Sequence, residues 1–362
     1  MQLKKKELFA GILLLWAIII HLWSLNSQRV EEQYSLRFFP VLSRFLRSVF
    51  GPVSFSVGDI LYGAIVVFLL IKLFVLLRFI LSRKRRQNFR NHLREGIVST
   101  LTAACVVYIL FNLLWGINYN RIGIAGQLGL KIEKYDVEEL KTINGVLIEK
   151  INSSKMILLA DNKPYPSQKE LFNMTAAAYT QISEKYSFLK YKPASIKSSM
   201  WGSIGNYTGF VGYYNPFTGE AQVNTTVPAF TQPFTACHET AHQLGYAKEM
   251  EANFAGYLAA SASNDTIFHY SVYADLFSYA NRTLYFADSA AALKFRKMLL
   301  PEVIADFKAA KKFNDEHRSF AEPVFKMLYG IFLRGNKQPM GMLSYDEVTG
   351  FIIAYYKKFA SI

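Results

Sequence analysis

Three long apolar stretches constrain the fold of this 362-residue chain more than any other feature of its sequence. They run from about Phe9 to Leu25, from about Val57 to Leu81 and from about Ile97 to Ile117. Each is long enough, as a helix, to cross about 30 Å of hydrocarbon. Because hydrocarbon offers no partners for backbone polar groups, we expect each stretch to be a transmembrane helix.

The distribution of Lys and Arg predicts how these helices are oriented. The first stretch follows Lys4, Lys5 and Lys6 but is not followed by a small-residue cleavage site, which indicates an uncleaved signal anchor. The loop at 83–94 holds six basic residues in twelve positions, so it and the N-terminus are expected in the cytoplasm. With three spans, residues 118–362 are then expected outside the cytoplasm, at the plasma (inner) membrane.

The net charge of +14 belongs mainly to the membrane region. Residues 1–117 hold 15 Lys and Arg against 5 Asp and Glu, a balance of +10, which leaves 26 against 22 for residues 118–362. The latter region has no basic stripe with interleaved aromatic residues. The sequence therefore predicts a lipid bilayer as a partner and no role in nucleic-acid binding.

Residues 118–362 show a mainly helical pattern with one short strand-rich region. Capping boxes at Asp136–Glu139 and Ser167–Glu170 predict helices that continue to about Ile151 and Tyr186. Residues 195–224 favour a hairpin, with one strand near 207–214 and its partner near 220–224. Helices are expected from Thr231 onward, with an interruption near 335–341 before a last helix at about 345–359. The expected fold class is α+β: three transmembrane helices, then a mainly helical domain with a small antiparallel sheet.

The sequence His238-Glu239-Thr240-Ala241-His242 is the motif that indicates a chemistry. Two imidazoles at positions i and i+4 lie on one face of a helix and can bind the same Zn²⁺ ion. Glu239 would lie beside that ion, where it can take a proton from water as the water attacks a carbonyl, and then pass it to the leaving amine. We therefore expect one zinc ion held by His238 and His242, with Glu239 as the catalytic residue.

A catalytic zinc site usually has three protein ligands, so a third is expected on the next helix. Gly245 can end the motif helix, and a second helix beginning near Lys248 offers Glu249 or Glu251. The spacing Glu249-x-x-x-Asn253 favours Glu249, because Asn253 could then accept the second N–H of a zinc histidine. Glu251 remains the alternative.

Several other side chains could belong to the site, but each can also be explained by packing or by a position on the surface. Tyr213 and Tyr214 alternate on the expected strand, so one of them could face the cleft and stabilise an oxyanion or contact the substrate. His269 and His317 are further candidate ligands, but each also fits a surface or core position. Cys237 fits a small buried packing residue.

The motif region resembles the gluzincin peptidases, in which HExxH is followed by a glutamate on the next helix. In the CAAX prenyl endopeptidases and the β-lactam sensor receptors this helix carries Glu-x-x-x-Asp, and here Asn253 occupies the aspartate position. Metzincins place a third histidine where this chain has Lys248, so the sequence departs from that class. The resemblance implies a zincin-like domain with Glu249 as third ligand.

Nearly the whole chain resembles an uncharacterised bacterial family of three-span membrane proteins with this domain. The resemblance rests on three stretches: the run from Gly212 to Glu220, the segment from His238 to Phe254, and Gly341 with Ser344-Tyr345. The family implies no particular substrate.

Together these features predict a membrane-anchored zinc metallopeptidase that hydrolyses peptide bonds in a peptide or protein substrate. One alternative is a non-catalytic zinc-containing membrane protein that binds or senses a ligand. The other is a zinc amidase acting on cell-wall peptides, because the same chemistry opens any accessible amide. The presence of Glu239 favours an enzyme, since a structural zinc site has no need of that carboxylate.

Overall fold

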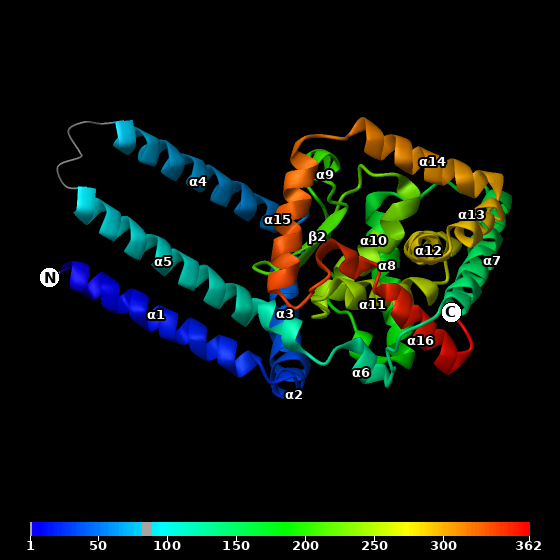
Figure 1. The fold of residues 1–362 in the computed structure, drawn as a ribbon, viewed down its shortest axis with the longest axis horizontal. Coiled ribbons are helices and arrows are strands. Elements are labelled where there is room, and N and C mark those ends of the chain that lie inside the picture. Colours follow the sequence, from blue (N-terminus) through cyan, green and yellow to red (C-terminus); the bar gives the residue numbers. More distant parts are fainter. Residues whose placement is uncertain (1, 82–88) are drawn as a thin grey trace.

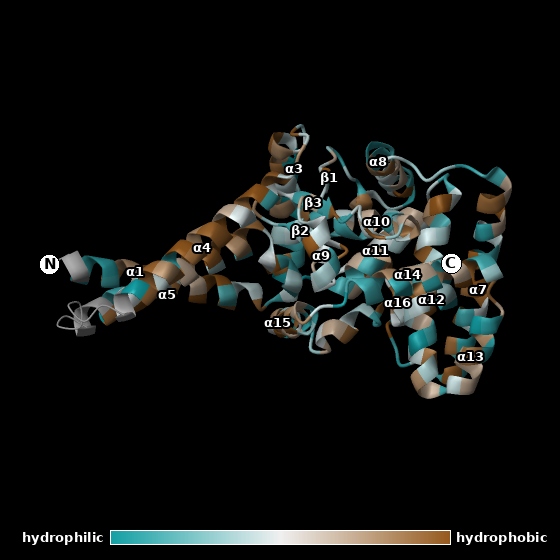
Figure 2. Cartoon of the chain, turned by 90° about the horizontal axis from the view of Figure 1, so that it is seen from above, coloured by the Kyte–Doolittle hydropathy of each residue, from teal (hydrophilic) through white to brown (hydrophobic). Residues whose placement is uncertain are grey.

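The computed structural model describes residues 2–81 and 89–362 and contains the three expected apolar helices, α1 (Gln2–Ser24), α4 (Val57–Leu81) and α5 (Phe89–Leu114). Each of them is long and apolar enough to cross a membrane. They project together from one side of the globular part (Figure 1). Long stretches of these helices carry the colour of hydrophobic residues (Figure 2). Residues 82–88, which include half of the basic loop at 83–94, lie outside the described residues, so the orientation stays a prediction.

The third apolar helix ends three residues earlier than the sequence predicts. Helix α5 stops at Leu114, and a 3₁₀-helix, η3 (Gly116–Asn120), follows where the span was expected to continue to Ile117. Trp115 and Ile117 are buried, and the Trp115 indole Nε1 donates to the carbonyl of His242 at 3.1 Å. These apolar residues therefore belong to the core of the globular part, a role that hydropathy alone does not distinguish from a span.

The segment between the first two apolar helices is also helical and packs on the globular part. It comprises α2 (Ser27–Arg29), the π-helix η1 (Val30–Phe38) and α3 (Phe39–Phe50). Tyr34 stacks with Phe39, and both lie in a small core with Trp115 and Tyr214. The membrane region thus contributes side chains to the core of the domain.

The remaining helices include a central pair, α10 and α11, around which the others pack. They are α6 (Ile124–Leu128), α7 (Val137–Asp161), α8 (Gln168–Lys185), η4 (Ser187–Leu189), α9 (Gly202–Thr208), η5 (Ala229–Thr231), α10 (Gln232–Gln243), α11 (Glu249–Ser261), α12 (Thr266–Ala287), α13 (Ser289–Lys297), α14 (Pro301–Glu316), α15 (Ala321–Gly335), η6 (Gly341–Tyr345) and α16 (Val348–Phe359). Both predicted capping boxes are present, although α7 continues ten residues beyond its expected end. All residues of α10 from Pro233 to Gln243 are buried, so the motif helix lies inside the molecule.

The sheet has three strands in the order β1–β3–β2 and is mixed rather than antiparallel. Strands β2 (Gly212–Asn215) and β3 (Glu220–Val223) form the expected hairpin, whereas β1 (Ile196–Ser198), which the sequence did not indicate, pairs in parallel with β3. The first hairpin strand was expected from 207, but residues 202–208 form helix α9. Gly209, at φ +83° with its N–H bonded to Gly205 O, ends that helix and leaves only four residues for β2.

A buried ion pair joins the membrane side of the chain to the domain. The Glu31 carboxylate accepts from the Arg121 guanidinium Nε and a terminal nitrogen at 3.0 and 2.7 Å, and both residues are almost fully buried. Burial alone would raise the pKa of Glu31, but the hydrogen bonds and charge of Arg121 hold it below its usual value. Arg121 also donates to the carbonyl of Gly245, so the pair fixes the turn after the motif helix.

We expect Glu31→Gln to lower the free energy of unfolding by about 3 kcal/mol, because it leaves the Arg121 charge buried without its partner. The pKa of Glu31 is lower in the folded state, so its stabilisation is complete above about pH 4.3 and is lost as the pH falls. Thermal unfolding of the protein in detergent from pH 7 down to about pH 2 measures both effects. Glu138→Gln, which removes an exposed ion pair with Lys141, is the control and should leave Tm unchanged. Equal Tm values for the two variants would contradict the prediction.

Candidate metal centre

Residues near its two ends determine where helix α10 begins and ends. Pro233 lies in its first turn, where a missing N–H costs nothing. At the other end Gly245, at φ +86°, donates to His242 O, and Tyr246 N donates to Ala241 O. This left-handed turn reverses the chain, so that the next helix, α11, begins at Glu249 beside the motif.

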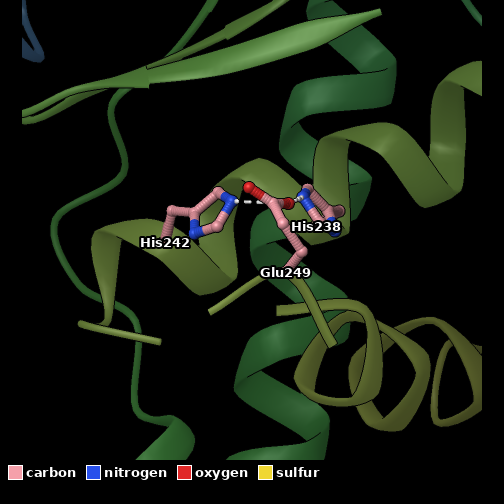
Figure 3. Close-up of side chains that lie close together, drawn as sticks. All are labelled: His238, His242 and Glu249. Atoms are coloured by element: carbon pink, nitrogen blue, oxygen red, sulfur yellow. Dashed lines mark ion pairs between the residues drawn. The ribbon is translucent and has the colours of Figure 1, made fainter. Parts of the chain in front are cut away.

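The side chains of His238, His242 and Glu249 point toward one another (Figure 3). Glu249 Oε2 lies 3.2 Å from His238 Nε2 and 3.6 Å from His242 Nε2, and the three ligand atoms lie within 4.8 Å of one another. Two ligands that are each about 2.1 Å from one tetrahedral zinc ion are roughly 3.4 Å apart. The spacing of these buried atoms therefore fits the ligands of a single ion.

Hydrogen bonds at the Nδ1 atoms of His238 and His242, on the side of each ring that faces away from Glu249, fix the orientation of the two imidazoles. His238 Nδ1 lies 2.7 Å from Asn253 Oδ1, the arrangement expected from the Glu249-x-x-x-Asn253 spacing, and His242 Nδ1 lies 2.7 Å from the Tyr246 carbonyl oxygen. Both partners are acceptors, so each Nδ1 donates to its partner, and the Nε2 atoms, which face Glu249, are the ring nitrogens left for a metal ion. These contacts fix the orientation of both imidazole rings.

Tyr329, which no pattern in the sequence singles out, orients the Glu249 carboxylate. Its hydroxyl donates to Glu249 Oε1 at 2.6 Å, while Glu249 Oε2 lacks a conventional hydrogen bond within the described part of the chain. Tyr329 lies on α15, eighty residues away along the chain, where no local pattern connects it to the motif. One carboxylate oxygen is thus held by a phenol and the other faces the histidines.

Glu251, the alternative third ligand, lies elsewhere. Its carboxylate pairs with Lys248 at 3.3 Å and packs against Gly123, where a Cβ atom would lie 2.0 Å from Glu251 Oε1. Gly123 has φ +86°, so it supplies both the backbone conformation and the space. Glu251 therefore stabilises the linker after the third apolar helix.

Glu239 lines a cleft of about 410 Å³ next to the three convergent side chains. Its Oε2 atom is buried and has no hydrogen-bond partner among the residues described. Burial raises the pKa of Glu239 to about 7, against the lowering effect of the two neighbouring imidazoles. Burial would likewise raise the pKa of Glu249, but its contacts with His238 and His242 hold it well below the usual range. The two glutamates are therefore suited to different tasks.

Other residues that line the cleft come from distant parts of the chain. They include Phe210, Val211, Asp275, Tyr279, Arg282, Phe325, Met342 and Tyr345. Burial raises the pKa of Asp275 to about 6, although the nearby His238 acts in the opposite direction. Tyr345 stacks on the His238 imidazole at 6.2 Å between ring centroids. The sequence identified none of these neighbours of the motif, because α12 and η6 reach it only through packing.

The structure does not bring the other candidate residues of the sequence to His238, His242 and Glu249. The Tyr213 hydroxyl bonds Ser199 and Asp59, and the Tyr214 ring packs on Trp115, so neither phenol lines the cleft. The phenols that do so are Tyr279, Tyr329 and Tyr345. His269 and His317 bond nearby backbone carbonyls, and Cys237 is a buried free thiol.

Comparison with known proteins identifies a family for this chain. The family model described as "Protein of unknown function (DUF3810)" matches residues 34–353, most of the chain, so the chain belongs to this family. The match covers the second and third apolar helices and every residue of the candidate site. No curated protein and no solved structure matches the chain.

Gly212 provides the space that Glu239 occupies: a Cβ atom at this position would lie 2.6 Å from Glu239 Oε1. We expect Gly212→Ala to displace Glu239 or strand β2 and to destabilise the protein by about 1–3 kcal/mol. Thermal unfolding in detergent measures the loss. Gly145→Ala on α7 is the matched control, because its Cβ atom would meet nothing closer than 3.8 Å and alanine favours a helix. A Gly212→Ala protein as stable as this control would refute the steric argument.

Proposed function

We propose that this chain, a member of the family described as "Protein of unknown function (DUF3810)", is a membrane-anchored zinc metallopeptidase. The observation that carries the proposal is the convergence of His238, His242 and Glu249 beside a cleft lined by Glu239, whose Oε2 atom has no hydrogen-bond partner in the described part of the chain. The Lys and Arg distribution favours a site outside the cytoplasm.

The donor set fits zinc in a catalytic rather than a structural site. Two imidazoles and one carboxylate are typical of catalytic zinc, whereas structural sites use four protein ligands. Within the described residues the group has three members, and it adjoins the cleft. Zinc bound there would supply a Lewis acid that polarises a carbonyl and lowers the pKa of water.

Glu239 is placed to move protons during hydrolysis. A carboxylate with a pKa of about 7 can take a proton from a water molecule in the cleft and return it to the leaving amine. Asn253 and the Tyr246 carbonyl hold the histidines, and Tyr329 holds Glu249, so the ligands need no rearrangement. These residues are positioning residues, while Glu239 acts on the reacting atoms.

The position of strand β2 favours a polypeptide as the substrate. It lies at an edge of the sheet, paired only with β3, and its first residue, Gly212, lines the cleft. Val211 O accepts from Asn224 N, so in this antiparallel ladder Gly212 directs its own N–H and C=O away from β3. An extended peptide can bond this free edge as an added strand, beside Glu239.

The proposal is tested by zinc content and peptide cleavage measured on the same preparations. We expect the full chain, purified in detergent, to hold about one zinc per molecule and to cleave members of a quenched-fluorescent peptide library. His238→Ala and Glu249→Ala should lose the zinc, because each removes a ligand. Glu239→Gln should keep the zinc and lose at least about 10²-fold in cleavage, because it removes only the proton acceptor.

Glu251→Gln is the matched control for Glu249→Ala, since both carboxylates lie in the first turn of α11. It should retain zinc. Loss of zinc from Glu251→Gln but not from Glu249→Ala would reassign the third ligand. A Glu239→Gln protein that cleaves peptides as fast as wild type would end the catalytic assignment.

We expect Tyr329→Phe to weaken zinc binding by about 10- to 100-fold, because it removes the hydrogen bond that orients Glu249. Competition with a fluorescent zinc chelator measures the affinity. Tyr213→Phe is the control, since it removes a half-buried phenol hydroxyl that bonds Ser199 and Asp59 and does not contact His238, His242 or Glu249. Equal zinc affinity in the two variants would show that Tyr329 does not position Glu249.

A further inference from the structure

Helix α15 exposes an apolar stripe that no described part of the chain covers. Val324, Met327, Leu328 and Ile331 are about half exposed and recur at intervals of three and four residues, so they lie on one face. In a globular protein such a face is normally buried against the core. Here the stripe is available to an outside partner.

The position of α15 relative to the apolar helices identifies that partner. Phe332, near the end of α15, packs edge-on against Phe111, one turn before the end of α5, with ring centroids 6.1 Å apart. Figure 1 shows α15 on the side of the globular part from which the apolar helices emerge, running across their direction. Helix α15 therefore lies level with the end of a candidate membrane span.

Helix α9 occupies the corresponding position at the second span. The indole of Trp201, which precedes α9, donates to the carbonyl of Asp59 at 3.2 Å and packs on Gly63, where a Cβ atom would lie 3.0 Å from the ring. Gly63 lies more than a turn inside α4, so the Trp201 ring reaches the depth of the span. Ile204 and Tyr207 of α9 are exposed. Tryptophan and tyrosine favour the interface between membrane and water.

The charges on α15 suit the same environment. Lys326, Arg334 and Lys337 are exposed at or just beyond the helix, against one acidic residue, Glu322, which pairs with Lys326. Long basic side chains can bury their stems in the apolar layer while the charged ends contact lipid phosphates. An apolar stripe flanked by basic residues is the pattern of a helix that lies in the plane of a membrane surface.

We propose that α9 and α15 lie in the interfacial layer of the bilayer that holds the apolar helices, and that the cleft opens there. Residues 208–212, at the end of α9, line one side of the cleft, and Phe325, Lys326 and Tyr329 of α15 line another. The mouth between these two helices faces lipid headgroups rather than bulk water. The substrate class that follows from this location rests on the proposed peptidase function. The substrates are then polypeptides held at the membrane surface, such as the segments adjoining a membrane span.

The proposal is tested by measuring the depth of single fluorophores in the full chain. Three variants each introduce one cysteine: Leu328→Cys on α15, Ile204→Cys on α9 and Leu293→Cys on α13. Each variant is labelled with NBD and placed in phosphatidylcholine–phosphatidylglycerol nanodiscs. Leu293 is the matched control, because it is 51% exposed against 54% for Leu328 but lies at the far end of the molecule. The native Cys105 and Cys237 are buried, and the unmutated protein corrects for their labelling.

We expect lipids brominated on their acyl chains to quench NBD at positions 328 and 204 at least twofold and to leave position 293 unchanged. The absence of quenching at both test positions would overturn the proposal. A blue-shifted NBD signal that lipids do not quench would count as this outcome, because it would indicate a protein partner rather than lipid. Quenching at 328 alone would overturn the location of the cleft mouth. The measurement needs no zinc, and His238→Ala should give the same pattern, so its outcome is independent of the peptidase assignment.

Discussion

The carbonyl groups at the C-terminal end of helix α10 and in the turn that follows it accept hydrogen bonds from the membrane side of the chain. Trp115 donates to His242 O at 3.1 Å, Ser43 to Gln243 O at 2.7 Å, and Arg121 to Gly245 O at 3.2 Å. The last carbonyls of a helix have no partner within it, and burying them without donors is costly. The end of the helix that carries His242 is therefore stabilised by segments that adjoin the apolar helices. For this reason the candidate metal centre and the membrane region form one structure rather than two independent parts.

This connection also explains the electrostatics of the site. Because α10 is buried along its length, Glu239 and Glu249 both lose their hydration, but only Glu249 contacts both imidazoles. One buried carboxylate is consequently held ionised while the pKa of the other is raised to about 7. Two glutamates ten residues apart are thus suited to metal binding and to proton transfer, a difference that comes from their surroundings. If the cleft also opens at the lipid surface, the same spans that complete the core would limit what reaches Glu239.

Features set by neighbouring residues were predictable from the sequence. The two capping boxes, the left-handed turn at Gly245 and the start of α11 at Glu249 are present, and Asn253 contacts His238 as its spacing suggests. Predictions that depended on distant packing were less accurate. The expected strand near 207–214 lost its first two residues to helix α9, which covers residues 202–208. Strand β1 was not foreseen because its partner β3 lies far along the chain, with Ile196 paired to Ala221, and Trp115–Ile117 entered the core rather than a membrane span.

The sequence by itself determined that three helices are long and apolar enough to cross a membrane and that two histidines share a helical face with a glutamate beside them. Both follow from composition and from the 3.6-residue period, which involve only local spacing. Only the tertiary structure decided between Glu249 and Glu251 as neighbours of the histidines, brought Tyr329 to the Glu249 carboxylate, and placed α15 beside the end of α5. These contacts join residues far apart in the chain, and they depend on how buried helices pack, which no local pattern encodes.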